Sequence, residues 1–478
     1  MNFPIIVYVT GWILRIEGVI MLLPFGVSLF YREDNPFLYL YIGLGCYLVG
    51  LFCSIKKPRI SDIAPRDGFV SVALGWILMS AVGALAFVFN GDIPDYIDAL
   101  FETVSGFTTT GASILSDVES LSRSGLFFRS FTHWIGGMGV FVFIMAVLPM
   151  MGGSSMNLIK AESTGPSVGK IVPKVKDTAK MLYAMYLGLT ILEMILLLCG
   201  GMSLFEASTL TFGTVGTGGF GILNSSIGSY SAYCQIVITV FMILSGMNFS
   251  FYFCLLRRHF KQAVTMEEIR WYLLIIFSAI ALISINIWEL YAPADAIRHA
   301  AFQVGSIITT TGYSTVNFDL WPEFSKTVLV VLMFIGGCAG STGGGMKVTR
   351  IAIMCKSIKK EISTMVHPRA VKKIKMDGKE VPHDVIRATN VYVCAYLVIL
   401  LLSTLIVSLD NYNFTTSFTA VVATLNNIGP GLDVVGPTGN FGGFSVLSKI
   451  VLMANMLIGR LEIFPILMLF SPRVWKKQ

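Results

Sequence analysis

Charged side chains are scarce in this chain of 478 residues, and their scarcity excludes most classes of soluble protein. Asp, Glu, Lys and Arg make up 13% of the sequence and hydrophobic residues 54%, whereas charged residues make up about 25% of soluble domains. Apolar runs of about 18 or more residues recur along the chain, and each is long enough to cross a membrane as a helix. The composition therefore predicts an all-α polytopic membrane protein.

The residue patterns of common enzymes and metal centres are also missing. The five His residues show no HExxH or other paired-ligand spacing, and no Ser/His/Asp set is apparent. His133 stands beside Trp134, and we expect it to pack near the membrane interface rather than to bind a metal. The eight Cys residues show no CxxC spacing and are expected as buried free thiols. We predict no enzymatic activity and no cofactor bound by this chain.

Positive charge is concentrated in a few segments, which predicts the topology. Of the 35 Lys and Arg residues, 27 fall in five segments: 56–66, 152–180, 257–270, 347–387 and 473–477. Because Lys and Arg are enriched in cytosolic loops, these segments and both chain termini are expected in the cytosol. The net charge of +7 then needs no nucleic-acid partner, since the cytosolic loops explain it.

Four turns rich in Gly and Thr lie between the apolar segments, on the side opposite to the basic ones. They align on Gly111, Gly219, Gly312 and Gly429, at intervals of 108, 93 and 117 residues. Their sequences are TTTGAS at 108–113, VGTGGF at 215–220, TTTGYS at 309–314 and NNIGPG at 426–431. Such internal repetition predicts four equivalent structural units.

A short helix precedes each turn and a long helix flanks the pair on either side. The short segments, near 97–109, 203–216, 294–309 and 414–427, have about 10–15 residues and cannot cross a hydrocarbon core of about 30 Å. Irregular backbone at membrane depth is tolerated only where it is buried in protein or lines a cavity. The expected architecture is two leading transmembrane helices and four helix–pore-loop–helix repeats around one pore. We expect the boundaries 1–60, 61–165, 166–262, 263–370 and 371–478.

The chemistry of the turns suits a monovalent cation. Glycine lets successive carbonyls face one direction, and each short helix would point the negative end of its dipole at the axis. No carboxylate occupies a turn, so carbonyls would replace the hydration shell of the ion. Four acidic residues follow the turns: Asp117, Glu119, Asp319 and Asp433. They either form an acidic outer mouth that attracts cations or are ordinary charged residues of surface loops. Glu102 and Glu206, in the short helices, are at least as suited to structural hydrogen bonds as to ion contact.

A glycine cluster interrupts the last long segment of the third repeat. Gly336, Gly337, Gly340, Gly343, Gly344 and Gly345 fall within ten residues, and each costs a helix about 1 kcal/mol relative to Ala. We expect this stretch to unwind on the cytosolic side of the turns and to obstruct the pore. A glycine packing face is the structural alternative. A phosphate-binding loop is disfavoured, because Lys347 is one place late and no strand precedes it.

Arg460 lies inside an apolar span, which makes a functional role the default expectation, since burial of its charge costs about 3 kcal/mol or more. The structural alternative is an ion pair with Glu193, Glu289 or Glu462. Glu462 is the less suitable partner, because positions i and i+2 of a helix do not face each other.

These turns, the glycine segment GGCAGSTGGGMK at 336–347 and Arg460 resemble those of the Trk/Ktr/HKT superfamily of potassium transport proteins, and most of all its bacterial TrkH members. The resemblance covers nearly the whole chain. It implies a homodimer with one pore per subunit in the bacterial inner membrane. It also implies potassium rather than sodium, because Gly111 stands where sodium-preferring members have Ser. The implied filter residues are Thr110, Gly111, Gly218, Gly219, Thr311, Gly312, Ile428 and Gly429.

The resemblance also implies how the pore is controlled. The glycine segment with Lys347 corresponds to an intramembrane gating loop, and the Arg that matches Arg460 projects into the pore. A cytosolic TrkA-type ring with nucleotide-binding domains would dock on segment 347–387, so that the nucleotide binds the partner. In the second turn Gly216 is the alternative to Gly219 as the filter glycine. We expect gated, channel-like potassium uptake; a symporter coupled to H⁺ or Na⁺ is the alternative.

Overall fold

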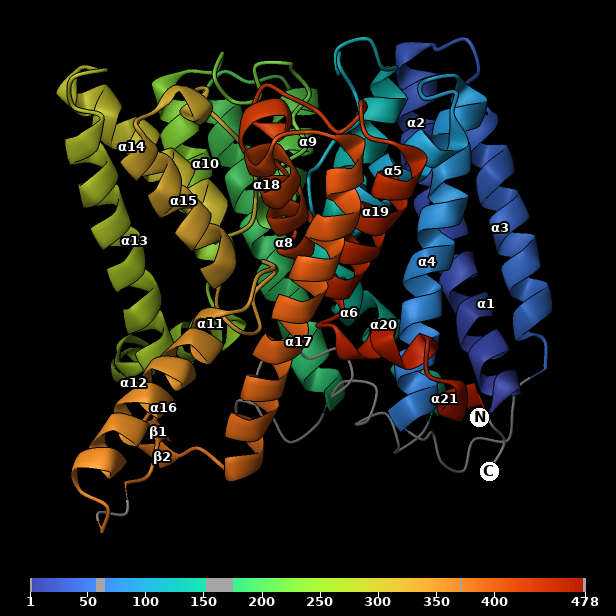
Figure 1. Ribbon diagram of the computed structural model, residues 1–478. Helices are drawn as coiled ribbons and strands as arrows, with labels where there is room; N and C mark the ends of the chain where they lie inside the picture. The colour runs from blue at the N-terminus through green and yellow to red at the C-terminus, as the bar shows by residue number, and fades with distance from the viewer. Residues whose placement is uncertain (1, 57–64, 152–174, 370–371, 476–478) are drawn as a thin grey trace.

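The two leading membrane helices lie at one edge of the molecule. The computed structural model describes residues 2–56, 65–151, 175–369 and 372–475. Helices α1 (Phe3–Ile20) and α2 (Leu22–Tyr31) form one apolar span, and α3 (Leu38–Ser54) returns beside them. Glycines on the two partners let α1 and α3 approach closely, because a Cβ at Gly11 would lie 2.8 Å from the carbonyl oxygen of Gly50. This pair packs on α4 (Pro65–Asn90), with the other helices on the far side of α4 (Figure 1).

Four helix–turn–helix units follow, and each contains one short helix. The short helices are α5 (Tyr96–Phe107), α9 (Leu204–Val215), α14 (Pro293–Ile308) and α18 (Phe414–Leu425). The long helices before them are α4, α8 (Val175–Cys199), α13 (Glu267–Asn286) and α17 (His383–Val407). All four short helices lie in the upper half of the view in Figure 1, opposite the termini. The molecule is thus an all-helical membrane protein with channel-like pore loops.

Local sequence signals fix where the short helices begin. The side chain of Asp95 accepts hydrogen bonds from the amides of Ile97 and Asp98 at 2.9 and 3.0 Å. Ser203 and Glu206 form a reciprocal capping box on α9, and Asn413 caps α18. The third short helix has no side-chain cap and starts with Pro293 in its first turn.

The helices after the turns of repeats 2, 3 and 4 are all broken. In repeat 2, α10 (Ala232–Ser245) and α11 (Phe249–Leu256) meet at 94°. In repeat 3, α15 (Glu323–Ile335) and α16 (Val348–Val366) flank the glycine segment. In repeat 4, α19 (Val446–Arg460) is followed by α20 (Phe464–Leu469) and α21 (Pro472–Trp475). Only the break in repeat 3 was expected; the expectation of one long helix after the second turn and one after the fourth was wrong.

Local contacts explain the two unexpected breaks. A Cβ at Gly246 would lie 2.5 Å from the hydroxyl oxygen of Tyr272, and Asn248 caps the new helix through the amide of Ser250 at 2.8 Å. In repeat 4, Glu462 and Ile463 have φ values of 56° and 68°, and Pro465 follows in the first turn of α20. The first helix after a turn, α6 (Arg123–Met151), runs without such a break.

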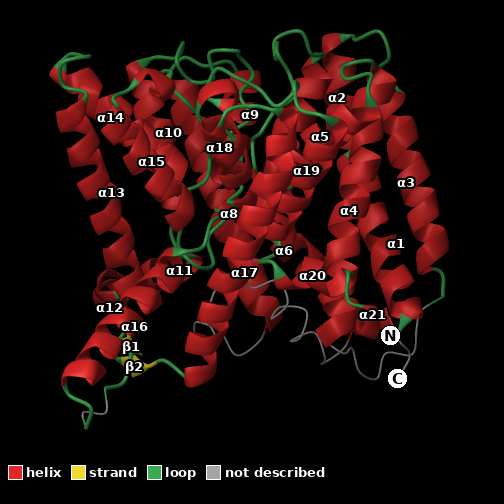
Figure 2. Ribbon diagram, in the orientation of Figure 1, coloured by secondary structure: helices red, strands yellow, loops and turns green. Residues whose placement is uncertain are grey.

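The described basic segments lie at the face that also carries both termini (Figure 1). This face includes α12 (Phe260–Thr265), the lower end of α16 and a hairpin of β1 (Lys375–Met376) and β2 (Lys379–Glu380). Three one-turn 3₁₀ helices occur elsewhere, Phe318–Leu320, Ser408–Asp410 and Asp433–Val435. Figure 2 shows that helices dominate the fold and that long loops gather at the opposite face.

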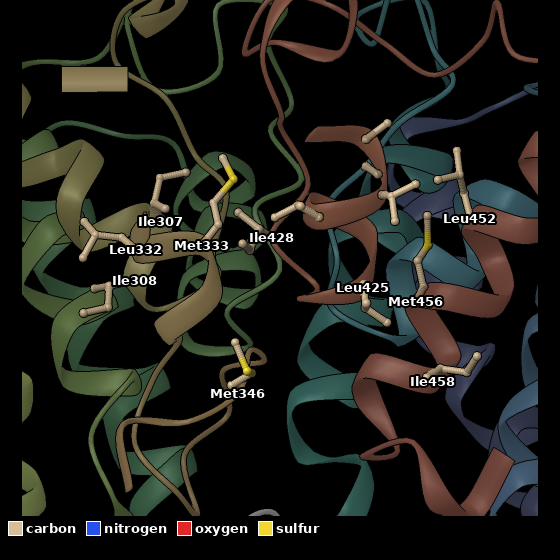
Figure 3. Close-up of a cluster of buried hydrophobic side chains, with 14 of the residues drawn as sticks. Ile307, Ile308, Leu332, Met333, Met346, Leu425, Ile428, Leu452, Met456 and Ile458 are labelled. Atoms are coloured by element: carbon tan, nitrogen blue, oxygen red, sulfur yellow. The ribbon is translucent and has the colours of Figure 1, made fainter. Parts of the chain in front are cut away.

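The core between repeats 3 and 4 surrounds one of the Gly/Thr turns. Figure 3 shows Ile307, Leu332 and Met333 on one side of Ile428. The facing side is formed by residues of α18 and α19: Leu425, Leu452, Met456 and Ile458. All of these side chains are buried. The fourth turn is therefore held by apolar packing on both sides.

Candidate functional site: four turns, a glycine segment and a buried arginine

The four turns share one backbone conformation. Each has a positive φ at its glycine, between 77° and 101°, and a second positive φ two residues earlier, between 54° and 58°. The glycines are Gly111, Gly219, Gly312 and Gly429, and the earlier residues are Thr109, Thr217, Thr310 and Asn427. A positive φ is a genuine outlier for β-branched threonine and costs of order 1–3 kcal/mol. Three strained threonines at matching places indicate a conformation that the surrounding structure enforces.

The turns close into a ring. A Cβ added at Gly111 would overlap the carbonyl oxygen of Gly218, and one at Gly219 would overlap that of Thr311. In the same way, a Cβ at Gly312 of the third turn would overlap the carbonyl oxygen of Ile428 in the fourth turn. A Cβ at Gly429 of the fourth turn would lie 2.8 Å from the carbonyl oxygen of Thr110 in the first turn. Each glycine thus leaves room for a carbonyl of the next turn, and the fourth turn meets the first.

The second turn takes the register that places Gly219 with the other three glycines. The backbone equivalence puts Gly218 at the position of Thr110 and Thr311, and Gly216 at that of Thr108. A Cβ at Gly218 would overlap the ring of His133, which is fully buried and donates a hydrogen bond from Nδ1 to the Gly106 carbonyl at 2.8 Å. His133 therefore packs behind the ring of turns, and its expected place at the membrane interface was wrong.

Side-chain hydrogen bonds stiffen the turns. The hydroxyls of Thr108 and Thr110 lie 2.8 Å apart, as do those of Thr309 and Thr311. Asn427 donates from Nδ2 to Thr110 Oγ1 at 3.0 Å and to the Met456 carbonyl at 2.8 Å. The fourth turn is thereby tied both to the first turn and to α19.

Glu102 and Glu206 take structural roles. The buried carboxylate of Glu102 pairs with Arg129 at 2.5 Å and accepts hydrogen bonds from Ser113 Oγ and the amide of Ile114 at 3.0 and 3.1 Å. Glu206 belongs to the capping box of α9. Both residues are thus engaged by protein donors beside the turns.

The acidic residues beyond the turns also bond to nearby loops. Asp117 accepts from Asn224 Nδ2 at 2.8 Å, and Glu119 accepts from the amide of Asn224 at 2.9 Å. Asp433 accepts from Asn413 and from Thr416 Oγ1, the latter at 2.9 Å. These bonds brace the loops, and the carboxylates of Asp117, Glu119 and Asp433 remain exposed.

The glycine segment lies directly against the ring, on the side of the chain termini. Gly344 donates from its amide to Thr310 Oγ1 at 2.6 Å, and a Cβ at this residue would overlap the Asn426 carbonyl. A Cβ at Gly343 would lie 2.8 Å from the Thr309 carbonyl. Contact this close with the third and fourth turns is possible only for glycine, so the segment packs directly against both of these turns.

Lys347 folds back over the same segment. Its side chain is only 2% exposed, and Nζ donates to the carbonyl of Gly343. Lys347 also has φ of 76° at the start of α16, while Gly336, Gly340 and Gly345 have φ between 68° and 76°. Gly337 lies beside the start of α16, and its carbonyl accepts from the amide of Val348 at 3.0 Å.

Arg460 joins the ring to the glycine segment. Nη1 donates to Thr109 Oγ1 at 3.2 Å and to the Thr342 carbonyl at 2.7 Å, and Nη2 donates to the Gly136 carbonyl at 2.7 Å. Glu462 is not its partner through an ion pair; that carboxylate pairs with Arg350 at 2.5 Å. The guanidinium therefore bridges the first turn, the glycine segment and α6.

Sequence reasoning missed three contributors to this site. His133 fills the space behind the second turn, Asn427 links two turns, and Glu268 bonds to the glycine segment. His133 is a polar side chain in a largely apolar segment, Asn427 belongs to a turn that the sequence had singled out, and Glu268 stands in the charged run Glu267–Arg270. The partner could not be read from these signals, because it lies far away in the sequence.

This arrangement defines a membrane protein of the pore-loop class, in which four half-length helices present a ring of backbone carbonyls. The family model for TrkH, a cation transport protein, matches residues 50–477. The Trk system potassium uptake protein TrkH of Escherichia coli K12 is 36% identical, and that of Vibrio parahaemolyticus 37%, each over 100% of both chains. The chain belongs to the TrkH family of cation transport proteins.

The fold agrees with a solved member of this family. The crystal structure of the potassium transporter TrkH from Vibrio parahaemolyticus matches with a TM-score of 0.90 and 34% identity. The match covers 100% of both chains. The two leading helices are thus part of the shared architecture, as are the four repeats.

Proposed function

We propose that this chain takes up potassium through a gated, channel-like pore. The closed ring of four turns carries the proposal, because each glycine makes room for a neighbouring carbonyl and the ring contains no carboxylate. Carbonyl oxygens without fixed charge suit a monovalent cation that sheds its water. The relatives are named as potassium uptake proteins, which supports the choice of potassium.

The proposed ion ligands are the ring residues, and the proposed control lies below them. We assign potassium binding to Thr110, Gly111, Gly218, Gly219, Thr311, Gly312, Ile428 and Gly429. The gating loop comprises Gly336, Gly337, Gly340, Gly343, Gly344, Gly345 and Lys347, and Arg460 supplies the pore cation. The division into 1–60, 61–165, 166–262, 263–370 and 371–478 places one turn in each repeat.

The proposed setting is the bacterial inner membrane, with both termini in the cytosol, as the distribution of Lys and Arg favours. We propose a homodimer with one pore per subunit. A cytosolic TrkA-type ring would bind segment 347–387 and carry the nucleotide. A cytosolic subunit that still co-purified after Lys372 and Lys373 were replaced by Ala would argue against docking at that segment.

Flux in liposomes tests the function and separates it from the symporter alternative. Purified protein is reconstituted, and uptake is measured under potassium, rubidium and sodium gradients. We expect potassium and rubidium to move down their gradients and sodium to move at least tenfold more slowly. Equal sodium and potassium flux would refute selectivity. Uphill potassium movement driven by a pH or sodium gradient would establish the symporter instead.

The gating loop makes a separate prediction. Replacing Gly344 by Ala should raise basal potassium flux several-fold, because the new Cβ overlaps the Asn426 carbonyl and lies 3.0 Å from Asn427 Cβ. Overpacking of this kind costs about 1–3 kcal/mol, which disfavours the closed position of the loop.

Gly340→Ala is the matched control for that variant. Its Cβ would meet nothing closer than 3.6 Å, although its φ of 68° adds backbone strain. If both variants raised flux equally, backbone loosening rather than collision with the ring would explain the effect. Unchanged flux in folded G344A protein would remove the gating role of the loop.

A further inference from the structure

A buried carboxylate outside the ring holds the glycine segment in place. Glu268, in the first turn of α13, is 7% exposed. Oε1 accepts hydrogen bonds from the amide of Ala339 at 2.6 Å and from Thr349 Oγ1, and Oε2 accepts from Asn248 Nδ2 at 3.1 Å. These donors come from the glycine segment, the start of α16 and the break between α10 and α11. One side chain thus joins three irregular elements.

The glycine segment has further bonds to the same break. The amide of Cys338 donates to the Gly246 carbonyl at 2.9 Å, and the amide of Phe249 donates to the Gly340 carbonyl at 3.2 Å. The Glu268 side chain accepts from three different elements, so its loss would leave several buried donors unsatisfied.

The preceding residue faces the cytosolic hairpin. Glu267 forms an ion pair with Lys356 of α16, and its amide donates to Asp377 Oδ1 at 2.6 Å. The amide of Asp377 in turn donates to Glu267 Oε2 at 3.4 Å, and Lys356 Nζ donates to the Lys375 carbonyl at 2.6 Å. Asp377 lies in the turn of the β1–β2 hairpin, at the face of the termini (Figure 1).

We propose that Glu267 and Glu268 couple this hairpin to the glycine segment, with Glu268 as the positioning residue. The two carboxylates are adjacent at one helix end, so a displacement of the hairpin moves the end of α13 and pulls on Ala339 and Thr349. A partner that binds the hairpin would release the segment through this route. The proposal rests on the gating function proposed above for residues 336–347.

A native thiol reports the position of the segment independently of flux. Cys338 lies next to Ala339 and is fully buried. In a background that lacks the other seven cysteines, its reaction rate with a small cationic thiosulfonate measures how often the segment leaves its site. Flux through the same protein in liposomes is measured in parallel.

Glu268→Ala should raise the Cys338 reaction rate about tenfold and raise basal flux with it. Glu268→Gln, which keeps the size of the side chain, should give a smaller rise and serves if the alanine variant fails to fold. Glu267→Ala should raise the Cys338 rate severalfold, but it should add nothing to Glu268→Ala, because it acts through that residue.

Glu323→Ala is the matched control. It removes another glutamate from the first turn of a helix, α15, and with it the ion pair to Lys326 at 2.6 Å, which does not involve the hairpin. It should leave both readouts unchanged. Additive effects of the two glutamate variants, or a Cys338 rate that Glu268→Gln leaves at the wild-type value, would overturn the coupling. A raised Cys338 rate with unchanged flux would preserve the coupling and refute gating. If Gly344→Ala raised flux while Glu268→Gln left the Cys338 reaction rate unchanged, the gating role would stand and the coupling would be refuted.

Discussion

Replacing Gly312 by Ala is expected to reduce potassium flux by roughly tenfold or more and to weaken discrimination against sodium. Gly312 has φ of 86°, and an added Cβ would overlap the carbonyl oxygen of Ile428. That carbonyl must turn away to admit the methyl group, so the ring loses one of its ligands. A rise of about 1.4 kcal/mol in the barrier to conduction slows the rate tenfold. Uptake of potassium and sodium into liposomes measures both effects.

The control for Gly312 is Gly201→Ala. Gly201 has φ of 87°, yet no atom lies within 4 Å of the position of its Cβ. The two variants therefore carry the same backbone strain, and only one of them disturbs the ring. We expect wild-type flux and selectivity from G201A. Equal loss in both variants would trace the effect to strain, and normal selectivity in G312A would mean that the ring is not the filter.

Much of the fold could be predicted from the sequence because its signals are local. Apolar length gives the membrane helices, and segments too short to cross give the half-helices. All four turns found as a sequence repeat contain positive φ values at matching positions. In the second turn the residue that matches the other three glycines is Gly219 rather than Gly216. Glycine density likewise predicted the unwound segment in repeat 3.

The rest could not be predicted because it depends on tertiary partners. Gly246 is a single glycine in an apolar run, and its role in the break follows from Tyr272 and Thr309 beside it. Nothing near Gly218 in the sequence indicates that the His133 ring fills the space of the missing threonine side chain. The bonds from Glu268 span 71 and 81 residues to Ala339 and Thr349. Contacts over such separations are set by the packing of whole helices.

The asymmetry of the ring is a consequence of these contacts. Threonine pairs brace the first and third turns, a histidine ring backs the second, and Asn427 ties the fourth to the first. Each turn reaches the same backbone conformation with different support. Four unequal turns should form fewer well-defined ion sites than a fourfold-symmetric filter, so we expect the groups directly below the ring to control flow.

Arg460 is the group in which that control can be measured most directly. Arg460→Gln should raise potassium flux by about tenfold. A unit charge about 6 Å from a passing cation costs roughly 3 kcal/mol at an effective dielectric constant of about 20, which is more than the tenfold rise requires. The amide of glutamine can still donate to one of the carbonyls that Arg460 now contacts. Flux is measured in liposomes at equal protein content.

Two variants separate charge from packing at this position. Arg460→Lys keeps the charge and loses most of the three hydrogen bonds to Thr109, Thr342 and Gly136, so its flux should stay near that of the wild type. Lys449→Gln removes another buried cation of α19, paired with Asp98 at 2.5 Å, and should lower stability without raising flux. If Arg460→Lys raised flux as much as Arg460→Gln, the hydrogen bonds would be the barrier. Folded Arg460→Gln protein with wild-type flux would place the barrier in the glycine segment alone.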